Sequence, residues 1–200
     1  MYDLDCKYIF THPPKCAGAS VAKTLGLFGG PQPHPLFSRY KKLQHAHLSA
    51  HISELNKLQL NWQDFYKFSV ARNPWDRAVS RYFFEQTHTH HFNGLSFDQY
   101  IIQCYNFSTE KGSPHSHFTI KPYLFHENKY IMDHIIMQEN FDHDLAIAMK
   151  NLNIENYNTY HINQKTIRPT KDYRNFYNDA TKNMVTEMAK DSIEIFSYKF

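Results

Sequence analysis

A loop of small residues around one lysine is the part of this chain whose composition could bind an anion. The stretch from Ile9 to Ser20 reads IFTHPPKCAGAS, so an apolar run leads into a loop that contains Lys15 and Gly18. Small side chains let backbone N–H groups approach a phosphate or sulfate closely. The start of a helix adds about half a positive charge, and the lysine adds a full one. The residue types therefore predict a bound phosphate or sulfate.

The place of the lysine distinguishes this loop from the nucleoside triphosphate loop GxxxxGK[ST], in which the lysine follows the second glycine. Lys15 instead precedes Gly18. A magnesium-dependent NTPase also needs an acidic residue at the end of a neighbouring strand, whereas the apolar run 65–71 is followed by Arg72. The pattern favours a second anionic group near Arg72, without a metal.

Arg72 opens a second stretch, RNPWDRAVSRYF, in which Ser80 follows eight residues later. Pro74 suits the first turn of a helix. A guanidinium fork and a hydroxyl can bind the same phosphate. The chain therefore offers two candidate anion sites, each where a predicted strand turns into a predicted helix.

Together, the two stretches resemble sulfotransferases that use 3′-phosphoadenosine 5′-phosphosulfate (PAPS), in particular the Golgi-type family 2 carbohydrate sulfotransferases with their PKxGxxS and RNPxxRxxS signatures. The segment from Glu139 to Asp144 is similar to the family's ExxxxD stretch, and the closing IFSYKF is similar to its usual end. The resemblance spans nearly the whole chain. It implies a P-loop-like parallel β-sheet flanked by helices, and transfer of a sulfuryl group from PAPS to an acceptor hydroxyl, with a carbohydrate as the expected acceptor.

The resemblance also assigns residues to the two ends of the nucleotide. The 3′-phosphate site comprises Arg72 and Ser80. The 5′-phosphosulfate loop comprises Lys15, Cys16, Ala17, Gly18, Ala19 and Ser20. Cys16 and Ala19 stand where the family commonly has threonine, so two hydroxyl donors are missing and backbone N–H groups must do most of the binding. Lys15 is also expected to stabilise charge on the bridging oxygen as adenosine 3′,5′-bisphosphate leaves.

Histidines between the two stretches are the candidates for the general base. His47, in HLSA, resembles an HxxA element of the family, and a neutral imidazole accepts a proton near pH 7. His45 is the second candidate because the two form an HxH pair, and Glu54 is the carboxylate alternative. The chain has 14 histidines, so histidine alone is a weak signal. His88, His90 and His91 have no companion ligand at metal-site spacing, and we interpret them as a solvated or acceptor-binding loop.

Composition fits this interpretation. The 200 residues suit one domain, 1–200, with a sizeable core. A net charge of +3 is too small to indicate nucleic acid or a membrane surface. The three cysteines have no metal or disulfide pattern, and no apolar run reaches the ~20 residues of a membrane span. The first residues, MYDLD, lack the basic region and apolar core that a signal peptide would have. We expect a bacterial, cytoplasmic protein without membrane insertion.

Periodicity and turn residues predict alternating strands and helices, which favour a parallel α/β sheet with ligands at the carboxyl ends of its strands. The predicted strands are residues 7–12, 65–71, 130–137 and 157–162. The predicted helices are residues 18–28, 75–86, 97–104, 142–152 and 179–195, with further helical segments between 38 and 60. Loops are expected at 29–37 and over most of 87–118.

Two other functions stay open at this point. A nucleotide-dependent phosphotransferase or kinase could use the same architecture, and it would require a metal. A catalytically silent nucleotide-binding or glycan-binding module would bind the cofactor without transferring a group to any acceptor.

Overall fold

Short aromatic and β-branched runs form a four-stranded sheet in the computed structural model, which describes residues 1–27, 43–88, 92, 94–108, 118–162 and 168–200. The strand order is β1 (Tyr2–Asp3), β2 (Tyr8–Thr11), β3 (Tyr66–Ala71) and β6 (His134–Met137). β2 and β3 are parallel, as are β3 and β6, whereas β1 pairs with β2 in the antiparallel sense. The expected α/β class, with a sheet that contains parallel strands and is flanked by helices, is confirmed.

The chain divides into two compact units. Unit 1 consists of Met1–Ala71 and Lys121–Ile162, and it holds the sheet. Its other elements are α1 (Gly18–Thr24), α3 (Leu48–Lys57), η1 (Trp62–Asp64), α6 (Lys121–Leu124), the hairpin of β4 (Phe125–His126) and β5 (Lys129–Tyr130), η3 (Gln138–Asn140) and α7 (Phe141–Asn151).

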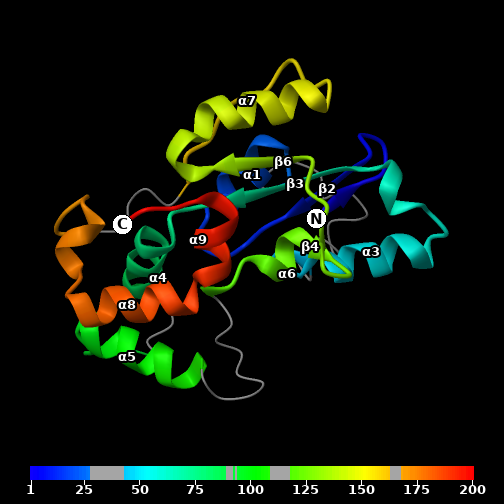
Figure 1. Ribbon diagram of the computed structural model, residues 1–200. Coiled ribbons are helices and arrows are strands. Elements are labelled where there is room, and N and C mark those ends of the chain that lie inside the picture. Colours follow the sequence, from blue (N-terminus) through cyan, green and yellow to red (C-terminus); the bar gives the residue numbers. More distant parts are fainter. Residues whose placement is uncertain (28–42, 89–91, 93, 109–117, 163–167) are drawn as a thin grey trace. The chain divides into compact units, whose positions relative to one another are not determined.

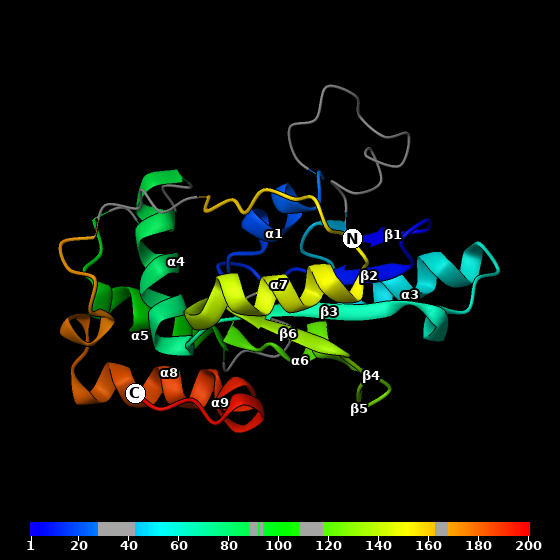
Figure 2. The ribbon, with the colours of Figure 1, turned by 90° about the horizontal axis from the view of Figure 1, so that it is seen from above.

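The central strands of unit 1 are buried because they have helices against them. All four residues of β2 are buried, as are the last five of β3, which is typical of parallel strands covered by helices. Phe10 and Phe68 stack at 4.9 Å between ring centroids and share one apolar cluster with Val21 of α1 and Leu145 of α7. α7 runs along β6 (Figures 1 and 2). This core fixes the carboxyl end of β2, where the lysine loop begins.

Unit 2 consists of Arg72–Ile120 and Asn163–Phe200 and is helical in its described residues. Its elements are α4 (Pro74–His88), α5 (Phe97–Ser108), η4 (Tyr173–Phe176), α8 (Asp179–Met188) and α9 (Lys190–Phe196). Trp75 of α4, Tyr100 of α5 and Val185 of α8 belong to its apolar core. Arg72 directly follows β3 in the chain, so the residue at which the units divide is also a predicted ligand residue.

Several predicted bounds are wrong. Residues 157–162 form no strand; instead, the Ile162 N–H donates to the Ser20 hydroxyl at 2.9 Å, so this segment is held by α1. The predicted helix 179–195 is two helices, which meet near Ala189. The first helix ends at Thr24, and the helix predicted at 97–104 continues to Ser108. The predicted loop 29–37 lies outside the described residues, as do 109–117 of the predicted loop 87–118.

Candidate functional site

The loop after β2 has an uncommon backbone conformation. Lys15 and Ala17 both have a φ of 65°, a left-handed conformation that costs an L-residue about 1–2 kcal/mol. Ala17 is the N-cap of α1, and its carbonyl oxygen accepts the Ser20 N–H at 2.9 Å. Turns with left-handed residues can direct successive N–H groups into one concavity, where anions bind. Backbone strain of this kind also concentrates at functional sites. The loop is therefore an anion-binding candidate by conformation as well as by composition.

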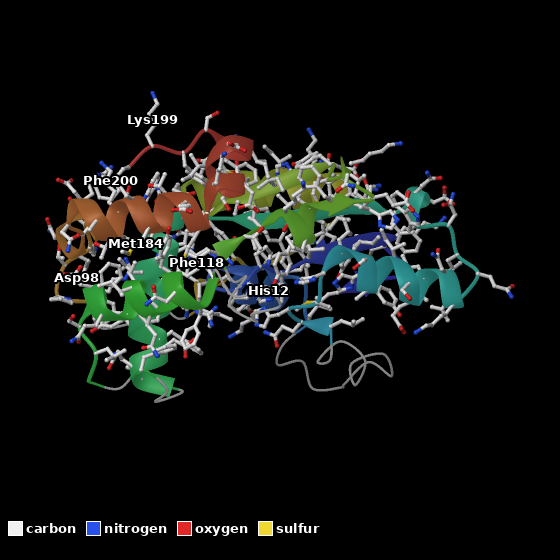
Figure 3. All side chains as sticks on the ribbon, turned by 60° about the horizontal axis from the view of Figure 1, so that its bottom comes forward. His12, Asp98, Phe118, Met184, Lys199 and Phe200 are labelled. Atoms are coloured by element: carbon white, nitrogen blue, oxygen red, sulfur yellow. The ribbon has the colours of Figure 1, made fainter. Side chains whose placement is uncertain are left out.

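Gly18 is required by the close approach of His12 (labelled in Figure 3). A β-carbon added to Gly18 would lie 1.8 Å from Cδ2 of His12 and 2.3 Å from its Nε2. The His12 side chain is buried, and its Nδ1 has no hydrogen-bond partner among the described residues. Burial lowers the pKa of His12 well below its usual value of 6.5, and the nearby His45 lowers that pKa further. The loop thus packs on a neutral imidazole.

The side chains of the predicted phosphosulfate loop divide into two groups. Cys16 is fully buried in the apolar cluster under the sheet's helices, so its side chain is part of the core. The Ser20 hydroxyl is 3% exposed and accepts the Ile162 N–H. Lys15, Ala17 and Ala19 are half-buried. At position 16, where the resemblance predicts a threonine, the side chain therefore contributes to core packing.

His45 lies beside the start of the loop. Its Nδ1 is 3.0 Å from the carbonyl oxygen of His12, and the two imidazole centroids are 4.6 Å apart. A carbonyl oxygen can only accept a hydrogen bond, so Nδ1 must carry the proton that it donates. In the neutral ring, Nε2 is then the nitrogen with the lone pair. The His45 side chain is exposed, so the ring combines a fixed tautomer with access to solvent.

His47 is exposed and is the N-cap residue of α3. Its ring lies edge-on to that of Tyr123, at 5.1 Å between centroids. The Tyr123 hydroxyl donates to the His45 carbonyl oxygen at 3.4 Å, and the Tyr123 carbonyl oxygen accepts from the Thr11 hydroxyl at 2.9 Å. Tyr123 thus connects the segment of both histidines to the end of β2. Glu54 forms an ion pair with Lys57 at 2.7 Å on the same helix.

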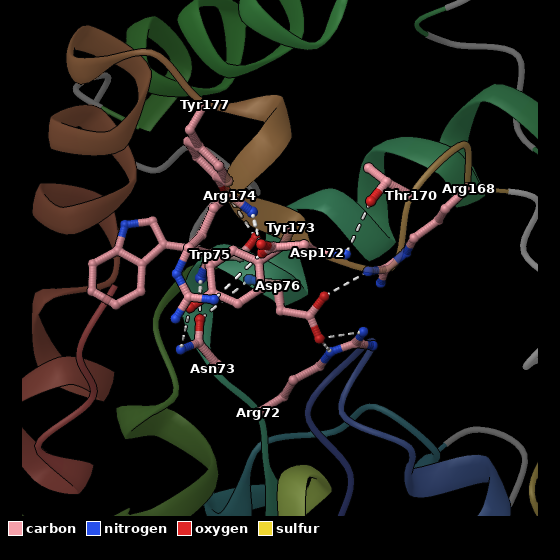
Figure 4. A network of polar contacts seen from close by, with 10 residues as sticks. All are labelled: Arg72, Asn73, Trp75, Asp76, Arg168, Thr170, Asp172, Tyr173, Arg174 and Tyr177. Carbon is pink, nitrogen blue, oxygen red and sulfur yellow. Dashed lines mark hydrogen bonds and ion pairs between the residues drawn. The ribbon is translucent and has the colours of Figure 1, made fainter.

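In unit 2, Arg72 is engaged by an acidic residue four positions later. Its Nε lies 2.8 Å and its Nη2 2.6 Å from Oδ2 of Asp76 (Figure 4). The other carboxylate oxygen, Oδ1, accepts from Nη1 of Arg168 at 2.6 Å. One carboxylate therefore holds two guanidinium groups. The side chains of Arg72, Asp76 and Arg168 are 13%, 17% and 15% exposed.

Asn73 begins α4 and holds it to later parts of unit 2. Its Oδ1 accepts the N–H groups of Trp75 and Asp76 at 3.1 and 3.3 Å, which satisfies donors that a helix start leaves unpaired. Its Nδ2 donates to the Tyr173 hydroxyl at 3.2 Å (Figure 4). The same Nδ2 donates to the Lys199 carbonyl oxygen at 3.2 Å. The first turn of α4, which carries Asp76, is thereby fixed.

Ser80 is buried on α4, with 6% of its surface exposed. It lies four residues after Asp76, and residues four apart share one face of a helix. The acidic partner of Arg72 and the predicted phosphate-binding hydroxyl therefore lie on the same face. The structure places Arg72 and Ser80 in unit 2 and the lysine loop with both histidines in unit 1.

Four residues near the candidate sites were not predicted: His12, Asp76, Tyr123 and Arg168. Asp76 could have been found, because an acidic residue four positions after Arg72 on a helix is a known pairing. Arg168 is 92 residues from Asp76 in the chain, and no local pattern indicates its contact.

No group of three or more His, Cys, Asp or Glu residues within the described ranges could hold a metal ion. The helices described are also too short or too polar to cross a membrane. No protein-family model, curated protein or solved structure matches this chain.

Proposed function

We propose that the protein is a PAPS-dependent O-sulfotransferase with a carbohydrate acceptor. The observation that carries the proposal is the loop after β2, which has two left-handed residues, one of them Lys15, and which packs through Gly18 on a buried, neutral histidine. Such a loop suits an anion bound mainly by backbone N–H groups. Its lysine order departs from that of nucleoside triphosphate loops, which favours the phosphosulfate over a triphosphate.

In this proposal, the two ends of the nucleotide are assigned to two separate groups of residues. Lys15 and the amides of residues 16–20 hold the 5′-phosphosulfate, whereas Arg72 and Ser80 hold the 3′-phosphate. Two observations support the assignment of Arg72 and Ser80 to the 3′-phosphate. Both residues have low exposure, and Ser80 lies on the same face of α4 as Asp76, which pairs with Arg72. Each assignment rests on contacts within its own unit.

The proposed reaction is a single in-line transfer. The acceptor oxygen attacks sulfur, an S–O bond to the acceptor forms, and the S–O bond to the 5′-phosphate breaks. Adenosine 3′,5′-bisphosphate leaves with the bridging oxygen, whose developing charge Lys15 stabilises. The acceptor proton passes to an imidazole. His47 is the first candidate for this base because its segment HLSA resembles the family's HxxA element, and its side chain is exposed at the start of α3.

One observation favours His45 as the base instead. The hydrogen bond from its Nδ1 to the His12 carbonyl oxygen fixes the tautomer in which Nε2 can accept a proton. Substitution of each histidine separately distinguishes the two, as developed in the Discussion.

Calorimetric binding tests the cofactor class. Adenosine 3′,5′-bisphosphate, 5′-AMP and Mg-ATP are titrated into the wild type, Arg72→Ala and Lys190→Ala. Lys190 is the matched control because its side chain is 74% exposed and its removal changes the net charge equally. We expect the bisphosphate to bind at least about tenfold more tightly than 5′-AMP, with this preference lost only in Arg72→Ala.

A metal-dependent preference for Mg-ATP would overturn the proposal in favour of a phosphotransferase. Preferential binding of the bisphosphate, without transfer of ³⁵S from labelled PAPS to any member of a carbohydrate acceptor panel, would instead support a catalytically silent module. Transfer that depends on Lys15 would establish the enzyme.

A further inference from the structure

The imidazole of His12 lies directly against the backbone of the lysine loop. Cδ2, Nε2 and Cγ of the ring are the atoms nearest to the space beside Gly18, and Nε2 is 2.3 Å from the position of an added β-carbon. The ring is therefore directed at the loop (His12 is labelled in Figure 3). An anion that accepts the Gly18 N–H would have an oxygen within roughly 8 Å of Nε2. At that distance, a charge on the ring would act on the anion.

One ring nitrogen of His12 lacks the partner that a buried polar atom usually has. The residue is 4% exposed, and its Nδ1 has no hydrogen-bond partner in the part of the chain that the structure describes. Most buried side-chain nitrogens are hydrogen-bonded, so an exception requires a structural or functional reason. Protonation at Nδ1 would break no hydrogen bond of this atom.

The titratable groups around His12 are basic. The ring centroid of His45 is 4.6 Å away, and the α-amino group of Met1, itself buried, lies 3.1 Å from Nε2 of His51. Lys15 is the charged side chain of the loop itself. Burial lowers the pKa of His12, and so do His45 and the α-amino group. A nearby anion would act in the opposite direction, because it favours the charged ring.

We propose that His12 takes up a proton when an anion binds in the lysine loop, so that the imidazolium supplies part of the charge that holds the anion. The inference rests on the proposed function, which assigns the phosphosulfate to this loop. The neutral ring carries one proton and the second comes from the solvent, so both nitrogens of the imidazolium are donors. By linkage, an anion that favours the protonated ring must bind more tightly as pH decreases.

The test follows the protonation of His12 with and without sulfate. Sulfate is the first probe because it stays a dianion over the range used, about pH 7.5 to 5.5, so any proton taken up belongs to the protein. Long-range ¹H–¹⁵N spectra of the wild type report the protonation state of each imidazole, and chloride at equal ionic strength is the reference. Backbone-correlated spectra assign the His12 ring, so this measurement does not depend on a variant.

Calorimetric titration of sulfate at each pH supplies the second measurement. His12→Asn and His12→Gln remove the titrating ring, and each keeps one amide nitrogen near a position of the imidazole nitrogens. His143→Gln is the matched control because it also removes one histidine, whose side chain is 68% exposed. Circular dichroism verifies that each variant is folded at every pH used.

We expect bound sulfate to move the titration of His12 to higher pH. Its affinity for the wild type should rise at least about threefold between pH 7.5 and 5.5. The rise should be smaller in His12→Asn and His12→Gln, and His143→Gln should match the wild type. If the His12 signals are the same with and without bound sulfate, or if His45 takes up the proton instead, the inference is wrong.

Titrations with adenosine 3′,5′-bisphosphate and 5′-AMP separate this inference from the proposed function. If sulfate binding protonates His12 but the wild type does not prefer the bisphosphate, the sulfotransferase proposal fails and the inference stands. If the wild type prefers the bisphosphate while His12 stays neutral with either ligand bound, the proposal stands and the inference is wrong. If neither sulfate nor the bisphosphate binds at any pH used, both are wrong.

Discussion

The imidazole of His12 occupies the space into which a side chain at Gly18 would project. An added β-carbon would lie 1.8 Å from Cδ2 of that ring, and the ring is buried against Phe10, with which it stacks at 5.9 Å. We therefore expect Gly18→Ala to destabilise the protein by about 1–3 kcal/mol, as overpacking does, and to weaken anion binding. Chemical denaturation measures the first effect, and calorimetry with 5′-AMP the second.

A double-mutant cycle with His12→Ala tests whether the loss of stability in Gly18→Ala comes from the contact with the His12 ring. Without the imidazole, the new methyl group has room, so Gly18→Ala should cost much less in the His12→Ala background. An equal cost in both backgrounds would mean that the loop excludes alanine for a reason other than the His12 ring.

The parts of the fold that the sequence predicted well are those with strong local patterns. The two central strands were predicted to within one residue at each end: 7–12 for β2 and 65–71 for β3. The signal for β3 was strong because it is an aromatic and β-branched run, buried over its last five residues. The start of α4 followed from Pro74 and its position after Asn73. The lysine loop was found from its small residues and the apolar run before it.

The rest depends on contacts between distant residues. Tyr2 and Asp3 form a strand only because β2 provides a partner, and a two-residue strand has no periodicity to detect. Residues 157–162 form no strand, and the Ile162 N–H donates to the Ser20 hydroxyl of α1. In the same way, the contacts of His12 with Gly18 and of Arg168 with Asp76 form only on folding, and no local sequence pattern indicates them.

The two most buried described histidines predict how stability depends on pH. Burial lowers the pKa of His12 and of His51 well below 6.5. Below that value the unfolded state binds more protons than the folded state, so the free energy of unfolding falls as pH decreases from about 6.5. Each histidine contributes up to about 1.4 kcal/mol per pH unit in this range. Urea denaturation at several pH values from about 7.5 to 5 measures the slope.

The variant His12→Asn isolates one of these contributions. It should be less stable than the wild type at pH 7.5, because packing is lost, but its stability should fall less steeply as pH is lowered. Parallel curves for the wild type and the variant would show that His12 is not kept neutral by the fold.

Substitution of Asp76 should lower the stability of the protein, and a bound phosphate should restore part of it. Asp76→Asn leaves the Arg72 and Arg168 guanidinium groups without their shared carboxylate, so we expect a loss of about 2 kcal/mol. A bound phosphate supplies the missing negative charge. Adenosine 3′,5′-bisphosphate should therefore raise the melting temperature of Asp76→Asn by more than that of the wild type. Differential scanning calorimetry measures both shifts.

The control for this prediction is Glu194→Gln, which removes one negative charge from an exposed pair with Lys190. It should leave both the melting temperature and the ligand-induced shift close to those of the wild type, because exposed ion pairs contribute little. A smaller ligand-induced shift in Asp76→Asn than in the wild type would contradict the idea that ligand and carboxylate neutralise the same arginines.

His45 and His47 give the sharpest test of the proposed chemistry, because the same substitution is made two residues apart. If His47 is the base, His47→Ala should lower turnover about 10²–10⁴-fold and leave the affinity for adenosine 3′,5′-bisphosphate unchanged. His45→Ala should then have a small effect. The reverse result would assign the base to His45, whose Nδ1 donates to the His12 carbonyl oxygen and leaves Nε2 as the acceptor. Turnover is measured with labelled PAPS over a range of pH, since loss of the base should also remove the acidic limb of the pH profile. If His45→Ala and His47→Ala each retain activity with the acidic limb of the pH profile intact, neither imidazole is the base.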